Sequence, residues 1–118
     1  MKPFNENYDG GDAGLSHIKE LFSRDTLLKS VSQKGNCRRW THRAMDILQP
    51  EGYLCEAREV DIGLSLSHTF LRVDLNGDNY ILDGVGVESH DPYYGLEENA
   101  PSHLSGSHSD VINVLRRM

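Results

Sequence analysis

Residues 68–86 read HTFLRVDLNGDNYILDGVG, and this stretch decides the fold that the sequence predicts. Strand-forming residues lie on both sides of Asn76-Gly77, the dipeptide that best fits a two-residue β-hairpin turn. The sequence therefore predicts two antiparallel strands, at 66–75 and 79–83.

The register of this hairpin places a histidine beside an aspartate. If the turn is as predicted, Phe70 lies opposite Asp83, so His68 and Asp83 share one sheet face as diagonal neighbours that a hydrogen bond can join. An aspartate in this position holds the imidazole in one tautomer and leaves its other nitrogen free to take a proton from a nucleophile.

A candidate nucleophile lies upstream in the stretch GNCRRW, where Cys37 is expected to begin a helix that Pro50 and Gly52 end. A thiol ionises most easily at a helix N-terminus, because unpaired N–H groups and the macrodipole favour the thiolate. Cys37 as nucleophile, His68 as base and Asp83 as orienting residue therefore form a candidate catalytic triad. Positive side chains nearby add to the effect: Lys34, Arg38 and Arg39. The apolar face of the helix, which should turn the thiol towards the sheet, consists of Cys37, Trp40, Ala44, Ile47 and Leu48.

Attack on an acyl carbon produces an oxyanion that needs hydrogen-bond donors. The backbone N–H of Cys37, at the helix start, is the natural first donor. The side chain of Gln33, four residues upstream, is the candidate second donor.

The remaining pattern adds helices and one more strand. Apolar residues between 15 and 31 recur at helical spacing, with a break near 23–25 that predicts two helices. The segment 53–62 is predicted to be a strand, with Leu54 and Val60 pointing inward.

Beyond Val87 the chain is rich in Pro, Gly, Ser, His and acidic residues, which predicts mostly loop up to a short apolar element at 110–116. We expect a flexible N-terminal arm at 1–13 and a single domain at 14–118. The predicted fold class is α+β, with N-terminal helices packed on a small antiparallel sheet.

Composition limits the kinds of partner. The 118 residues suffice for one core, and 37% hydrophobic with 25% charged residues is ordinary for a globular protein. A net charge of −6 argues against nucleic acid and against an anionic membrane, since phosphate binding needs a basic surface. No apolar run approaches the roughly 20 residues that span a bilayer, and the N-terminus lacks signal-peptide features. Cytoplasm is thus the default compartment, and secretion as an effector without a classical signal peptide is left open.

The order and context of the three residues resemble the transglutaminase-like branch of the papain-like cysteine enzymes. In that branch a cysteine at a helix start is followed by a histidine and an aspartate on adjacent strands. The stretch from His68 to Gly86 is similar to the histidine strand, turn glycine, Asp and Gly-x-Gly of arylamine N-acetyltransferases, and Gly35-Asn36-Cys37 is similar to the Gly-x-Cys of transglutaminases. The resemblance implies a papain-like core and thiol-based acyl transfer.

The first expectation is therefore a cysteine enzyme that acts on an amide of a protein or peptide, as a glutamine deamidase, a protease or a transglutaminase-like hydrolase, with hydrolysis preferred. A second is a non-catalytic adaptor of the same fold that binds a protein partner through the acidic loop after Val87. A third is an acetyl-CoA-dependent N-acetyltransferase, which the acidic balance beyond Val87 disfavours because the cofactor is an anion. The oligomeric state is left open.

The sequence offers weaker signals that we interpret structurally. Cys55 is expected to be packed core, both thiols to be free, and His42 to lie on the exposed side of its helix. Tyr93 and Tyr94 could equally line a groove or pack the loop down. No metal or cofactor is expected. The spacing of Asp74, Asn76 and Asp78 does not fit a calcium loop, and the loop histidines, which we expect to be solvated, are His90, His103 and His108.

Overall fold

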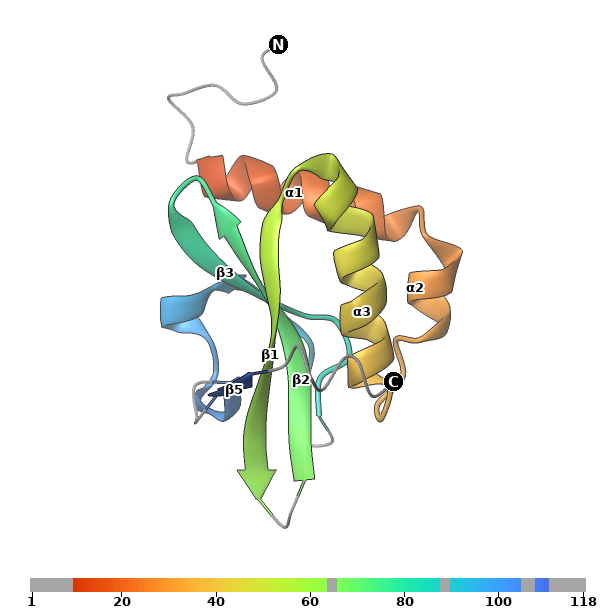
Figure 1. Ribbon diagram of the computed structural model, residues 1–118, viewed down its shortest axis with the longest axis vertical. Coiled ribbons are helices and arrows are strands. Elements are labelled where there is room, and N and C mark those ends of the chain that lie inside the picture. Colours follow the sequence, from red (N-terminus) through yellow and green to blue (C-terminus); the bar gives the residue numbers. More distant parts are fainter. Residues whose placement is uncertain (1–9, 64–65, 88–89, 105–107, 111–118) are drawn as a thin grey trace.

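The computed structural model describes residues 10–63, 66–87, 90–104 and 108–110, and these form an α+β fold (Figure 1). Two helices, α1 and α3, pack against one face of a five-stranded antiparallel sheet whose strand order is β4-β3-β2-β1-β5, and α2 packs on these two helices. The helices are α1 (Gly10–Ser23), α2 (Thr26–Ser30) and α3 (Cys37–Leu48). The strands are β1 (Leu54–Gly63), β2 (Leu66–Leu75), β3 (Asp78–Asp83), β4 (Tyr93–Leu96) and β5 (His108–Asp110).

The β2–β3 hairpin confirms the predicted turn and register. Asn76 and Gly77 have φ values of 58° and 93°, and two consecutive positive values are what a type I′ turn requires. The ladder runs from the Leu75–Asp78 pair to the Leu71–Leu82 pair. The Asp74 carboxylate accepts a hydrogen bond of 2.8 Å from the Gly77 N–H, which gives this side chain a role in the turn.

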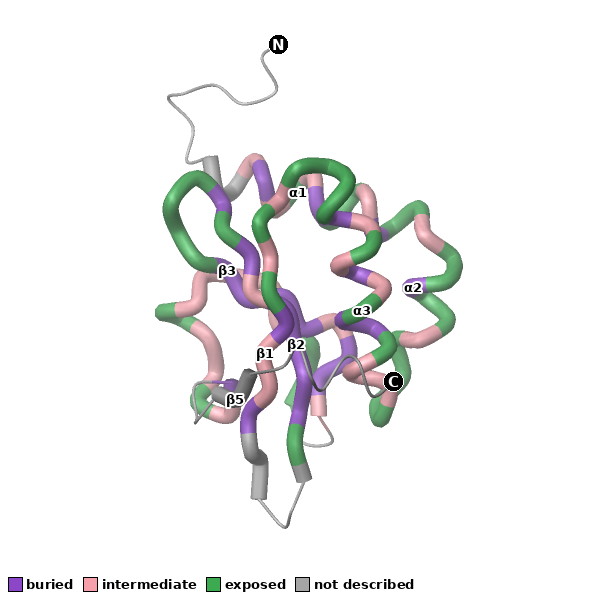
Figure 2. The backbone as a smooth tube through the Cα atoms, viewed as in Figure 1, coloured by how far each residue is buried: buried purple, intermediate pink, exposed green. Residues whose placement is uncertain are grey.

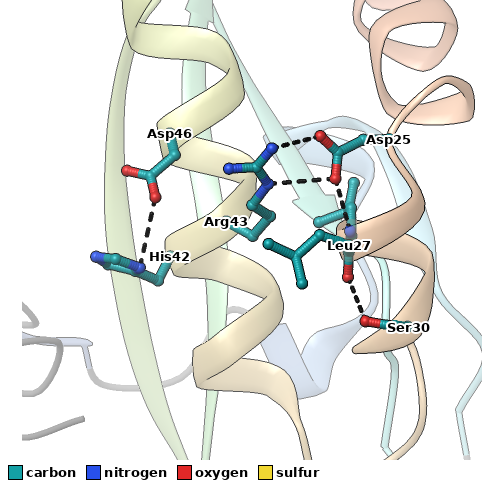
Figure 3. Close-up of polar contacts among 7 residues, drawn as sticks. Asp25, Leu27, Ser30, His42, Arg43 and Asp46 are labelled. Atoms are coloured by element: carbon teal, nitrogen blue, oxygen red, sulfur yellow. Dashed lines mark hydrogen bonds and ion pairs between the residues drawn. The ribbon is translucent and has the colours of Figure 1, made fainter.

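The predicted break between the first two helices is also confirmed, and Asp25 explains it. This residue caps α2 by accepting a 2.7 Å hydrogen bond from the Leu28 N–H, and it receives two further bonds from the guanidinium of Arg43 on α3, at 3.2 and 2.6 Å (Figure 3). The same view shows His42 beside Asp46 on the exposed side of α3, as predicted. Asp25 thus fixes α2 against α3.

The sheet separates two apolar clusters, and the buried residues concentrate along its central strands (Figure 2). The larger cluster lies between the helices and the sheet and is built around Ile18, Trp40, Leu48, Leu71 and Leu82. The smaller cluster consists of Val60, Phe70, Ile81 and Leu104, with Tyr93 and Ala100 packed on it. Side chains alternate along a strand, so His68 and Phe70 face the smaller cluster whereas Thr69 and Leu71 face the helices.

Leu54 corrects one prediction, because it is 73% exposed instead of pointing inward. It pairs with Asp74 at the hairpin end of the sheet, past the smaller cluster on that face. Val60, the other predicted anchor, is buried as expected.

Two boundaries also differ from the prediction. Residues 10–13, which we assigned to the arm, belong to α1, since Gly14 packs on Leu75 and the helix extends past this contact. Strand β4 lies in a region predicted as loop, because Tyr94 is partly buried against the larger cluster and the strand pairs with β3. The predicted arm at 1–9 and the apolar element after Asp110 lie outside the described residues. In the described part of the chain, no helix is long and apolar enough to cross a membrane.

Candidate active site

A buried hydrogen bond joins His68 to Asp83, as the hairpin register predicts. The imidazole Nε2 lies 2.8 Å from Asp83 Oδ2, and the two residues are only 2% and 1% exposed. The other carboxylate oxygen, Oδ1, accepts hydrogen bonds from the backbone N–H groups of Gly86 at 3.0 Å and Val85 at 3.3 Å. Asp83 is therefore fixed from two sides, and Nδ1 is the ring nitrogen that remains for another partner.

The Gly-x-Gly sequence after Asp83 lets the chain pass close to α3 and then fold back. A Cβ on Gly84 would overlap the ring of Trp40, so only glycine fits there. Gly86 has a φ of 75°, and a Cβ on it would lie 2.6 Å from the carbonyl oxygen of His90. These glycines shape the loop whose N–H groups hold Asp83.

Cys37 is the first residue of α3, as predicted, and its partly buried thiol lies beside the β2 residues His68 and Thr69. The β2–β3 ladder ends at Leu71, so His68 lies beyond it, where the start of α3 can reach the imidazole past the end of β3. The structure thus brings the three residues of the candidate triad together.

The pKa values of the thiol and the imidazole are shifted in opposite directions. Burial raises the pKa of Cys37, but hydrogen bonds to the His68 imidazole and to the Thr69 backbone outweigh it, so the net pKa is lowered. Burial likewise opposes the charged imidazole, but the hydrogen bonds to Asp83 and Cys37 raise the pKa of His68 to about 9. These shifts favour a thiolate paired with an imidazolium.

Thr69 is the functional candidate that sequence reasoning missed. It is 1% exposed, and its hydroxyl has no hydrogen-bond partner of good geometry, although both its side chain and its backbone lower the pKa of Cys37. Thr41, one turn along α3 from Cys37, also has a buried hydroxyl without a partner but has no such effect on the thiol. The position of Thr69 next to His68 was the available signal.

The start of α3 offers donors for an oxyanion. Its N-cap residue, Asn36, makes no side-chain capping hydrogen bond, so the first N–H groups of the helix are not used by that side chain. Gln33 is exposed, and its amide oxygen accepts a 3.4 Å hydrogen bond from the Asn36 amide. The predicted role of Gln33 as second donor stays a prediction.

The charged residues near Cys37 are mostly engaged elsewhere. Lys34 donates a 2.6 Å hydrogen bond to the carbonyl oxygen of Val87, which links the turn before α3 to the loop after β3. Arg38 pairs with Glu59 at 3.1 Å, whereas Arg39 is exposed. The positive charge predicted around the thiol therefore contributes less than the contact with His68.

Cys55 behaves as the predicted packed-core cysteine. It packs on the larger cluster, and burial raises its pKa to about 11. Both thiols are free, as predicted.

His103 corrects the prediction that the loop histidines are solvated, whereas His90 is exposed as predicted. The rings of His90 and His103 stack at a centroid distance of 4.0 Å, and both ring nitrogens of His103 are buried without a partner. Burial and the neighbouring His90 lower the pKa of His103, which favours the uncharged ring in this stack. The side chain of His108 lies outside the described residues. No group of three or more metal-ligating side chains occurs among the residues that the structure describes.

Both alternatives that the sequence left open for the two tyrosines occur, since Tyr93 packs the loop down whereas Tyr94 packs on the helices and also lines a cavity. Tyr94 makes edge-to-face contacts with Phe22 and Trp40, and the hydroxyl of Tyr93 donates a 2.7 Å hydrogen bond to the carbonyl of Leu96.

Comparison of the chain with protein-family models, with curated proteins and with solved structures gave no match, so its function is argued from the geometry of the site.

Proposed function

We propose that the protein is a cysteine enzyme with a papain-like core that cleaves an amide by acyl transfer, with Cys37 as nucleophile. One observation carries the proposal. A single buried imidazole, that of His68, contacts both a carboxylate and a thiol at a helix start, and the pKa values of thiol and imidazole shift towards an ion pair.

The transglutaminase-like branch is the version of this core that the arrangement supports best. A helix that begins with the cysteine packs on an antiparallel sheet, and two successive strands then carry the histidine and the aspartate. Each of the three residues is held by local structure, which is what a preorganised site requires.

In the first half-reaction, the Cys37 thiolate attacks the carbonyl carbon of the amide, and the carbonyl electron pair moves to oxygen. The backbone N–H of Cys37 donates to this oxyanion. When the intermediate collapses, the C–N bond breaks, and the leaving amine, or ammonia from a glutamine, takes the proton of His68. The product is a thioester on Cys37.

In the second half-reaction, His68 takes a proton from water, and the hydroxide attacks the thioester. The C–S bond breaks, a carboxylic acid leaves and the thiolate is restored beside a protonated imidazole. Asp83 keeps Nε2 occupied throughout, so Nδ1 serves both proton transfers. Hydrolysis is the outcome that we propose, on a protein or peptide substrate.

Competitive labelling of the two thiols tests the proposal. Iodoacetamide near neutral pH should modify Cys37 at least about tenfold faster than Cys55, because only Cys37 has a lowered pKa. His68→Ala should remove most of this difference.

An activity probe with a glutamine-like electrophile, followed by mass spectrometry, should label Cys37 in the wild type and only weakly in Asp83→Asn. Equal rates of labelling for Cys37 and Cys55 in the folded wild-type protein would contradict the proposal.

A further inference from the structure

A cavity of about 290 Å³ opens between the three helices and strand β4, and the proposed chemistry does not use it. Its aromatic floor is formed by Phe22, Trp40 and Tyr94, which meet edge to face at centroid distances of 5.5, 6.2 and 6.3 Å. Leu28 adds an aliphatic wall. We call this cavity, together with its lysine rim, the Trp40 pocket.

Two lysines make the rim of the Trp40 pocket positive. Lys19 and Lys29 are both exposed, and neither pairs with a carboxylate among the described residues. Lys19 Nζ lies 5.8 Å from the centroid of the Tyr94 ring. In a chain with 18 acidic and 12 basic residues, two lysines left unpaired beside one apolar cavity favour an anionic ligand there.

The hydroxyl groups that line the pocket already donate hydrogen bonds within the protein, so they do not require a hydrogen-bonding ligand. The hydroxyls of Ser23 and Ser32 donate to helix carbonyls, those of Glu20 and Leu28. The floor therefore recognises an apolar group by packing, while the charge lies only at the opening. An aromatic ring suits a floor of three edge-to-face rings, since aromatic pairs prefer offset and edge-to-face contacts.

Size and position connect the pocket to the thiol. Its volume lies just below the range of about 300–1,000 Å³ for sites that hold drug-sized ligands, so it accepts one side chain more readily than a nucleotide cofactor. Trp40 lies one helical turn, about 5 Å of rise, after Cys37. Gly84, which lines the pocket beside Trp40, directly follows Asp83.

We infer that the Trp40 pocket is a substrate subsite that binds an aromatic side chain of a protein segment whose neighbouring residues are aspartate or glutamate. The ring fills the floor and the flanking carboxylates meet Lys19 and Lys29. This inference names the substrate class of the proposed enzyme and so rests on the proposed function, although binding can be measured without catalysis.

The chain contains one tryptophan, so Trp40 fluorescence reports occupancy of the pocket directly. The test uses the full chain with Cys37→Ser, which prevents turnover, and titrates it with the peptide acetyl-Glu-Phe-Glu-amide. We expect a saturable change in Trp40 emission that weakens with added salt. Replacing the phenylalanine by alanine, or both glutamates by lysine, should weaken binding at least about tenfold.

Charge reversal at the rim supplies the matched comparison. Lys19→Glu and Lys29→Glu should each weaken binding about two- to fivefold, as expected for exposed charge pairs. Arg39→Glu makes the same charge change on an exposed residue of α3 that does not line the pocket, and it should leave the affinity unchanged.

Three results would overturn the inference: equal binding of the alanine peptide, equal effects of the lysine and Arg39 variants, or binding of phenylacetate as tight as that of the peptide, which would identify a small aromatic acid as the occupant. If the peptide fails to bind while Cys37 keeps its fast alkylation, the substrate class is wrong and the proposed enzyme survives. If the peptide binds and Cys37 is inert, the pocket stands as a peptide-binding site and the proposed function falls.

Discussion

At the scale of single residues, the imidazole of His68 is the group on which the candidate site depends. Nε2 is bonded to Asp83, so the ring cannot rotate without breaking a buried hydrogen bond. Phe70 stacks on the same ring at 6.3 Å, which limits its tilt. The remaining nitrogen is thereby held towards the one thiol whose pKa is lowered.

The ion pair should exist over a defined range of pH. Because the pKa of Cys37 is lowered and that of His68 is raised to about 9, thiolate and imidazolium coexist from below the ordinary thiol range up to about pH 9. Amide cleavage should decline as the pH rises through about 9, because His68 then loses the proton that the leaving amine needs. Asp83→Asn removes a cause of the raised pKa, so the titration of the His68 ring, followed by NMR, should move to lower pH. An unchanged titration in Asp83→Asn would contradict the assigned role of the carboxylate.

The hydroxyl of Thr69 should stabilise the thiolate. Thr69→Val keeps the shape of the side chain but removes the hydroxyl, so the pKa of Cys37 should rise and its alkylation near neutral pH should slow about three- to tenfold. The pH dependence of iodoacetamide modification measures both effects.

Thr41→Val is the control for this substitution. It also removes a buried, unpartnered hydroxyl, but one that does not act on the thiol, so the alkylation profile should match that of the wild type. If the two variants slow alkylation equally, loosened packing and not a hydrogen bond is the cause.

At the scale of elements, the contact of Asp25 with Arg43 holds helix α2 in place. Helix α2 has only five residues, too few to be stable alone, so its position depends on its cap and on packing of Leu28. Because α2 carries Leu28 and Lys29, its position also sets the shape of the Trp40 pocket.

Two substitutions at Asp25 should separate the cap from the ion pair. Asp25→Asn keeps an acceptor for the Leu28 N–H, whereas Asp25→Ala loses it and should lower the free energy of unfolding by about 1 kcal/mol more. The pKa of Asp25 is lowered, chiefly by its hydrogen bond to Arg43. Because this pKa is lower in the folded state, the ionised Asp25 side chain stabilises the fold above the ordinary aspartate pKa of about 3.9. This stabilisation is lost as the pH falls through the folded-state pKa. Urea unfolding should therefore give a higher free energy of unfolding for the wild type than for Asp25→Asn at neutral pH, and equal values in acid. A difference that persists in acid would show that the charge of Asp25 is not responsible.

Local chemistry explains which elements could be predicted. The Asn76-Gly77 turn fixes the hairpin register without help from the rest of the chain, and Pro50 and Gly52 end α3 by backbone restriction alone. Strand β4 could not be predicted, because its order comes from pairing with β3 and from partial burial of Tyr94 against a helix distant in sequence. The exposure of Leu54 likewise depends on where the smaller cluster ends.

At the scale of the whole molecule, the candidate site lies where the two faces of the sheet meet. Cys37 belongs to the helix side with the larger cluster, whereas His68 belongs to the side of the smaller one. The diagonal placement of His68 and Asp83 followed from the register. The register did not predict which imidazole nitrogen binds Asp83, or that Thr69 acts on the thiol. Both depend on how a helix crosses the end of a strand.

Core substitutions on the two sides should therefore differ in their effect on the site. Leu104→Ala and Leu48→Ala both remove a fully buried leucine side chain and should each lower the free energy of unfolding by about 2–5 kcal/mol. Leu104 packs in the cluster with Phe70, behind His68, so its loss should also slow Cys37 alkylation. Leu48, at the far end of α3, should leave that rate unchanged in the folded protein. Equal rates in the two variants would mean that the smaller cluster does not position the imidazole.

Helix α3 begins without a side-chain cap, and this lowers the stability of the helix while it favours the reactivity of the thiol. Helix starts favour a residue whose side-chain oxygen accepts hydrogen bonds from the first amide hydrogens, but the Asn36 amide donates to Gln33 instead. Selection for heat resistance alone would favour a serine or threonine cap at this position. Variants obtained in that way should melt later yet react more slowly, because the occupied amides could no longer receive negative charge that develops at the sulfur or on a substrate.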